Sequence, residues 1–289
     1  MWSNFKKKFI GDRDFYSYVL RLAVPMIVQN AITSFVSFLD NIMVGQIGTE
    51  QMSGVAIVNQ LMFVFNICIF GAVSGAGIFG TQFYGKGDYE GQTYAYRFQV
   101  YASALITGIA ICLFVFAGDA LISLYLNDSG SVGDITLALE YGLEYLAIMV
   151  VGLFPFALGQ TYISSVRECG QTFVPMIAGV AAVFTNLVLD VILIFGLLGM
   201  PAMGVKGAAI ATVIARFVEC IIVVAWTHAH KDKNKFIVGA YNSLRIPKNI
   251  LIAILKKGTP LMLNEMFWAS GMAVIAQCYA VRGLEVVAA

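Results

Sequence analysis

The sequence predicts an all-α polytopic membrane protein, with a six-helix bundle as an N-lobe and a seventh transmembrane helix that opens a second, truncated lobe. Hydrophobic residues make up 59% of the 289 residues and charged residues only 12%, whereas soluble domains carry about 25% charged residues. The apolar residues are also grouped into stretches that can cross a bilayer core, which takes a helix of about 20 residues. The composition therefore argues against a soluble fold.

Seven apolar stretches reach this length, at approximately 16–42, 52–80, 94–118, 137–160, 172–198, 204–227 and 258–280. A transmembrane β-barrel would need short strands of alternating polarity, and the apolar runs do not alternate. Helices are therefore expected. The expected divisions are a cytoplasmic N-terminus (1–15), the N-lobe (16–227), a cytoplasmic interlobe linker (228–257) and the first helix of the truncated C-lobe (258–289).

Basic residues alternate in density from one loop to the next. They gather before the first stretch, between the second and third, between the fourth and fifth, and between the sixth and seventh. The loops of the opposite side hold only Lys206 and Arg282. Because cytoplasmic loops carry the excess of lysine and arginine, we expect the N-terminus to be cytoplasmic.

The seventh stretch repeats features of the first. Segment 23–30 aligns with 258–265 at an offset of 235 residues, which pairs Pro25 with Pro260. The same offset gives the pairs Gly48 with Gly283 and Glu50 with Glu285. Repeated bundles are common in transporters, so we interpret this match as a period of six helices. On this interpretation the chain looks cut short soon after its second lobe begins.

Ionisable side chains deep in a membrane helix cost about 3 kcal/mol or more, which makes each one a functional hypothesis. The candidates here are Asp40, Asp190, Arg216, Glu219 and Glu265. Arg216 and Glu219 are three residues apart on one helix, a spacing that favours a neutralising ion pair. Glu265 has two open interpretations, as a ligand for substrate or ion in the second lobe or as a side chain that reaches the cytoplasmic surface.

One face of the first helix is polar. Its residues recur at spacings of three and four, namely Gln29, Asn30, Thr33, Ser37, Asp40 and Asn41. Side chains at these spacings share a helix face, so this stripe is expected to line a substrate cavity.

A second polar group lies at the depth of Asp40. Asn186 and Asp190 are four residues apart on the fifth helix, and Thr212 lies on the sixth. A helix rises 1.5 Å per residue. By this measure Asp40, Asp190 and Thr212 each lie about 12 Å from the outer end of their helix. Two neighbouring carboxylates in a low dielectric need a proton or a cation, so the group predicts a coupling site in which Asp40 and Asp190 hold H⁺ or Na⁺. The alternative is a structural hydrogen bond between helices.

Motifs of soluble enzymes do not fit the pattern. Residues 75–80 read GxGxxG, but they lie inside an apolar helix and not after a strand. The sequence has no GxxxxGK[ST] or HExxH motif. We therefore expect no enzyme, no cofactor other than the coupling ion, and no nucleic-acid partner.

Several motifs taken together resemble the multidrug and toxic compound extrusion (MATE) family. They are segment 40–45 (DNIMVG), segment 82–85 (QFYG), segment 167–175 (RECGQTFVP), segment 186–190 (NLVLD) and segment 204–212 (GVKGAAIAT). The resemblance implies an antiporter of the cytoplasmic (inner) membrane, monomeric when full length, with two six-helix lobes around a central cavity. It implies the exchange of Na⁺ or H⁺ for amphipathic or cationic small molecules, with the N-lobe cation site at Asp40, Asn186, Asp190 and Thr212.

Two departures from the family pattern leave alternatives open. Most of the second lobe is not in this sequence, and in some members the acid of the seventh helix falls where this chain has Trp268. A flippase for lipid-linked saccharides is one alternative, although its cavity should be strongly cationic and Arg216 is the only deeply placed basic residue. A transport-inactive fragment, or a half that pairs with another half, is the other.

Overall fold

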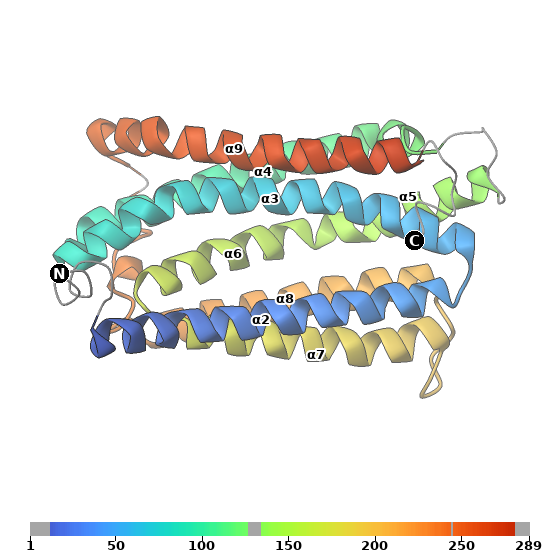
Figure 1. Cartoon of the computed structure of the whole chain (residues 1–289), viewed down its shortest axis with the longest axis horizontal. Coiled ribbons are helices and arrows are strands. Elements are labelled where there is room, and N and C mark those ends of the chain that lie inside the picture. The colour runs from blue at the N-terminus through green and yellow to red at the C-terminus, as the bar shows by residue number, and fades with distance from the viewer. Residues whose placement is uncertain (1–11, 127–133, 244, 281–289) are drawn as a thin grey trace, which may run out of the picture.

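A computed structural model describes residues 12–126, 134–243 and 245–280 as a bundle of long helices that run side by side (Figure 1). The helices are α2 (Arg13–Gly45), α3 (Thr49–Lys86), α4 (Tyr89–Ser123), α5 (Ile135–Val151), α6 (Leu153–Glu168), α7 (Phe173–Phe195), α8 (Val205–Ala229) and α9 (Lys248–Ala280), with a short 3-10 helix, η1 (Lys235–Ile237). No strand occurs in these ranges. The all-α fold class is confirmed. The predicted pairs Gly48–Gly283 and Glu50–Glu285 have their second members outside the described residues.

Five of the described helices are long and apolar enough to cross a membrane: α2, α3, α4, α7 and α8. The predicted span at 137–160 is a broken one, because α5 and α6 meet at a bend of 47° and count as a sixth span only together. Helix α9 has 33 residues but is not among these candidates. Two adjacent lysines and the Asn264-Glu265 pair interrupt its apolar sequence.

Arg216 lies at the break between α5 and α6. Its Nη1 donates a hydrogen bond of 3.4 Å to the carbonyl oxygen of Gly152, and its guanidinium lies 5.0 Å from the ring centre of Phe156. Among the described residues the only ion pair joins Lys206 and Glu144, at 2.9 Å. Arg216 and Glu219 interact electrostatically, as the predicted pair implies, but they form no direct ion pair in the described ranges, and Arg167 also interacts with Glu219.

The helices form two groups in Figure 1, with α2, α7 and α8 on one side, α3, α4 and α9 on the other, and α6 between them. The largest apolar core is built mainly from α3, α5 and α8 and the start of α6. Its most deeply buried members include Ile57, Val58, Met149, Leu153 and Ala209. Helix α6 thus ties the two groups together.

Helix α9 begins at Lys248, earlier than the predicted 258, so the segment between α8 and α9 is shorter than the predicted linker. Its start lies 235 residues after Arg13, where α2 begins, and Pro25 and Pro260 lie inside the two helices. Both positions agree with the offset found in the sequence. The division into lobes stays a prediction.

Helix α9 packs against α3 at a pair of glycines. A Cβ atom on Gly75 would lie only 2.9 Å from the Cα of Gly258, so the two backbones approach closely because neither residue has a side chain. Gly75 is part of the GxGxxG string, which runs through the continuous helix α3. The string therefore does not follow a strand, as expected, and its Gly75 serves the packing of α9 on α3.

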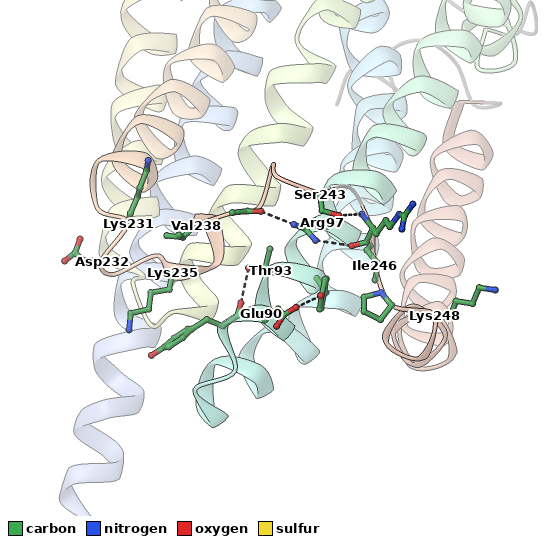
Figure 2. A pocket seen from close by; sticks show the side chains of 15 residues that line it. Glu90, Thr93, Arg97, Lys231, Asp232, Lys235, Val238, Ser243, Ile246 and Lys248 are labelled. Atoms are coloured by element: carbon green, nitrogen blue, oxygen red, sulfur yellow. Dashed lines mark hydrogen bonds between the residues drawn. The ribbon is translucent and has the colours of Figure 1, made fainter.

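The segment between α8 and α9, residues 230–247, is fixed to α4 by Arg97 (Figure 2). Arg97 is 8% exposed and donates to three carbonyl oxygens of the segment, those of Gly239 (3.0 Å), Ala240 (2.9 Å) and Arg245 (3.0 Å). Thr93 donates to the carbonyl oxygen of Phe236 at 2.9 Å. The segment is therefore a folded part of the bundle, beside a cavity of about 1090 Å³.

Candidate cation site

Two carboxyl groups from different helices meet inside the bundle. Asp40 lies near the end of α2 and Asp190 near the end of α7, and the two side chains are within hydrogen-bonding reach of each other. Asp190 is fully buried and Asp40 partly buried. Both oxygens of Asp190 and Oδ1 of Asp40 are buried without a donor among the described residues. Such a pair must share a proton or hold a cation, because two ionised carboxylates this close repel strongly.

Asn186 and Thr212 form a second pair beside it. Nδ2 of Asn186 donates to Oγ1 of Thr212 at 3.4 Å, and Asn186 lies one helical turn before Asp190. Helices α7 and α8 can approach this closely because of Gly207, where a Cβ atom would lie 2.7 Å from the backbone of Leu193. The structure therefore brings Asn186 and Thr212 together, as it does the two carboxyl groups.

Tyr145 of α5 also belongs to this site, and the sequence did not single it out. Its side chain is 4% exposed, lies close enough to interact electrostatically with Asp40, Asp190 and Arg216, and donates from its hydroxyl group to Oδ1 of Asn59 at 3.4 Å. In the sequence it counts as one more aromatic residue of an apolar stretch. Only the fold shows that its side chain lies near the carboxylates, with its hydroxyl group bonded to Asn59 and Thr212.

The polar stripe of α2 divides in the structure. Gln29 is buried and accepts a hydrogen bond of 2.8 Å from Nη2 of Arg167, so it lies in a helix interface. The side chains of Asn30, Thr33, Ser37 and Asn41 are exposed. Whether they line a substrate cavity stays a prediction.

Glu265 lies on a different part of the bundle. It is half-buried on α9 and packs near α3. A Cβ atom added to Gly71 of α3 would lie 3.4 Å from the Cβ atom of Glu265. The nearby Trp268 contacts the ring of Phe63 at 5.8 Å between ring centres. The role of Glu265 stays a prediction.

The donors of the site are carboxylate, amide and hydroxyl oxygens. In the described ranges no group of three or more His, Cys, Asp or Glu residues could hold a metal ion. Oxygen donors of this kind suit a hard cation such as Na⁺. The donor set of Asp40, Asp190, Asn186 and Thr212 therefore fits a monovalent cation, or a proton on the carboxyl pair.

A family profile, MatE, matches residues 25–192, which is more than half of the chain and includes both aspartates. The chain belongs to the MatE family. Its curated relatives include a probable multidrug resistance protein NorM of Thermotoga maritima, 27% identical over 92% of this chain and 55% of the relative. The multidrug export protein MepA of Staphylococcus saprophyticus is 25% identical over 86% of this chain and 52% of the relative. This MatE chain spans about half the length of these relatives.

Solved structures agree with the fold of this MatE chain. The inward-facing conformation of a multidrug resistance MATE family transporter matches with a TM-score of 0.74, over 94% of this chain and 59% of that one. An outward-facing conformation matches with a TM-score of 0.75, over 90% and 55%. Both are 22% identical to this chain. The fold is therefore that of part of a MATE transporter.

Proposed function

We propose that this MatE chain is part of a cation-coupled antiporter of the cytoplasmic membrane, which exports amphipathic or cationic small molecules in exchange for Na⁺ or H⁺. The observation that carries the proposal is the meeting of Asp40 and Asp190, with three buried carboxylate oxygens that have no donor among the described residues. The names of the relatives, which are a multidrug export protein and probable multidrug resistance proteins, support the class of substrate.

The chemistry of coupling follows from the carboxyl pair. Without a cation, a proton held between Asp40 and Asp190 removes their repulsion. A bound Na⁺ removes it as well and displaces that proton, with oxygen atoms of Asn186 or Thr212 available to complete its coordination. Protonation and ion binding therefore compete for one site. Each shifts the equilibrium between conformations of the helices that carry the two aspartates.

The substrate is expected to pass along the exposed polar side chains of α2. Asn30, Thr33 and Ser37 lie on the helix that also carries Asp40, so a change in ion occupancy at Asp40 can alter the surface that the substrate meets. If a small molecule contacts this surface in only one state of ion occupancy, its export is coupled to ion binding.

The experiment uses the full-length protein, reconstituted in vesicles, with the Na⁺ and H⁺ gradients collapsed separately. Asp40→Asn and Asp190→Asn should each abolish gradient-driven export of a cationic dye while leaving membrane insertion intact. Ser34→Ala, an exposed position on the same helix outside the polar stripe, is the matched control and should keep its dependence on the gradient. Undiminished export by Asp40→Asn would remove this aspartate from the mechanism.

A further inference from the structure

The cavity of about 1090 Å³ beside Arg97 is not part of the proposed coupling site (Figure 2). Two helices begin at this cavity, α4 with Tyr89 and α9 with Lys248, and both residues line it. Helix α4 has 35 residues and is about 52 Å long, whereas the hydrocarbon core of a bilayer is about 30 Å thick. Because charged residues lie at the start of α4, we expect this start, and the cavity with it, at the height of the lipid headgroups.

Arg97 gives the cavity a buried positive charge. It lines the cavity, is 8% exposed and donates one hydrogen bond from each of its three nitrogens to a backbone carbonyl oxygen. A guanidinium has five N–H donors, so two of them remain. In the described ranges the only ion pair is that of Lys206 with Glu144, so no carboxylate pairs with Arg97 there. A buried charge is costly without an opposite charge, and the cavity is therefore suited to an anion.

Positive charges outnumber negative ones around the cavity. Besides Arg97, the lining has four exposed cationic side chains, those of Lys231, Lys235, Arg245 and Lys248. Its carboxylates are Glu90 and Asp232, and neither forms an ion pair in the described ranges. Glu90 instead accepts a hydrogen bond from the hydroxyl group of Tyr94. With both carboxylates counted as fully ionised, the lining keeps an excess of three positive charges.

Two further donors are positioned by their own contacts. Nζ of Lys235 lies 4.3 Å from the ring centre of Tyr89, which holds this ammonium group at the start of α4. Oγ of Ser243 accepts a hydrogen bond of 3.2 Å from the backbone N–H of Arg245, so the hydroxyl proton stays available for donation. Figure 2 shows Lys235 and Lys248 on opposite sides of Arg97. An anion with several oxygen atoms would thus meet donors from two sides.

The size of the cavity and its apolar residues indicate the class of anion. Pockets of about 300–1,000 Å³ hold drug-sized ligands, so an inorganic phosphate ion would leave most of this cavity unfilled. Its lining also includes Ile246, Pro247 and Val238, and Val238 is 59% exposed. Ile252, one helical turn after Lys248, is 61% exposed. A phospholipid has a phosphate group for the cations and a glycerol with acyl chains for these apolar side chains.

The predicted topology favours the same ligand. The residues between α8 and α9 are predicted to be cytoplasmic, and the cytoplasmic leaflet carries anionic lipids. Basic pockets between membrane helices on that side bind anionic headgroups.

We propose that this cavity binds the phosphate group of an anionic phospholipid, between the starts of α4 and α9 and the 3-10 helix η1. The two remaining N–H groups of Arg97 donate to the phosphate, and Lys235, Arg245 and Lys248 surround it. The site goes beyond the proposed function, because binding here needs no ion exchange at Asp40 and Asp190.

Native mass spectrometry of the purified protein in a neutral detergent tests the proposal, with phosphatidylglycerol and phosphatidylcholine as probes. Phosphatidylglycerol should stay bound, and phosphatidylcholine, whose choline group cancels the phosphate charge, should not. The double variant Arg245→Gln with Lys248→Gln should bind phosphatidylglycerol about 25-fold more weakly, because each basic residue near an anionic headgroup contributes roughly fivefold. Asp40→Asn should bind it as wild type does, which separates this site from the coupling site.

The double variant Lys233→Gln with Lys256→Gln is the matched control. It removes the same charge from exposed positions of the same two parts of the chain, and neither residue lines the cavity. It should bind phosphatidylglycerol as wild type does, and both double variants should keep the wild-type unfolding midpoint without lipid.

Three outcomes would overturn the proposal. Equal losses of affinity in the two double variants would show that only the overall charge attracts the lipid. Equal retention of the two lipids would show that the phosphate charge is not recognised. Displacement of phosphatidylglycerol by an equal concentration of sodium phosphate would assign the cavity to free phosphate.

Discussion

Arg167 on α6 donates a hydrogen bond of 2.8 Å from Nη2 to the side-chain oxygen of Gln29 on α2. The amide of Gln29 lies against α7, where a Cβ atom on Gly179 would be 2.5 Å from its Nε2. One side chain therefore joins three helices. Gln29 is one of few buried residues of α2, together with Val36 and Val44.

Gln29→Ala should lower the stability of the bundle. It leaves Nη2 of Arg167 without its acceptor next to an Nε that is already buried and unpaired in the described ranges. An unsatisfied buried polar group costs about 1–3 kcal/mol, so the thermal unfolding midpoint in detergent should fall. Thr33→Ala, exposed on the same helix, should change stability by less than about 0.5 kcal/mol. Equal midpoints for the two variants would contradict the role of Gln29.

Tyr145→Phe should weaken Na⁺ binding and leave the fold intact. The substitution keeps the ring, which is 4% exposed, and removes the hydroxyl group near Asp40 and Asp190. The hydroxyl group also hydrogen-bonds the side chain of Thr212, a proposed ligand, and loss of that contact at about 1 kcal/mol corresponds to roughly fivefold lower affinity. Isothermal titration with NaCl measures this loss, and Tyr141→Phe, half-buried on the same helix, should bind as wild type does. Unchanged affinity in Tyr145→Phe would remove Tyr145 from the site.

Gly75→Ala should loosen the contact of α9 with α3. The new Cβ atom would lie 2.9 Å from the Cα of Gly258, and a backbone atom cannot move aside alone. Overpacking of this kind costs about 1–3 kcal/mol, which should appear as a lower unfolding midpoint. Gly108→Ala on α4 is the control, because a Cβ atom there meets nothing within 4 Å. That variant should be as stable as wild type or more stable by up to about 1 kcal/mol.

Arg97→Ala should release the segment between α8 and α9. It removes three hydrogen bonds to carbonyl oxygens of that segment, so trypsin should cleave faster after Lys231, Lys233 and Lys235. Mass spectrometry of the cleavage products over time gives the rates. Lys248→Ala, which alters an exposed residue at the start of α9, should leave them unchanged. Equal rates in Arg97→Ala and wild type would show that the hydrogen bonds do not hold the segment.

The arrangement of the polar residues was readable from spacing and depth. Asp40, Asp190 and Thr212 lie at a similar distance from the loops, and the structure places Asp40 beside Asp190 and Thr212 beside Asn186. Tyr145 was not readable, because an aromatic residue in an apolar stretch looks like packing. Its partners come from other helices, and their orientation depends on packing that one sequence does not show.

The helix breaks and the charge pairs were less predictable. Gly152 ends α5, but glycines also lie inside the continuous helix α3, so glycine alone does not mark a break. The spacing of Arg216 and Glu219 predicted an ion pair; the two charges interact without direct contact, while Arg216 donates to the carbonyl oxygen of Gly152 and Glu219 also interacts with Arg167. Local spacing identifies which groups can meet, whereas tertiary competition decides which of them do.

The exposed amides and hydroxyls of α2 determine how the bundle is turned about its long axis in a bilayer. Asn30, Thr33, Ser37 and Asn41 lie on the described surface, in a helix that is apolar enough to span a membrane. Facing acyl chains, each polar group without a partner would cost about 1–3 kcal/mol. This side of α2 is therefore expected to meet water or a polar protein surface and to face away from the lipid.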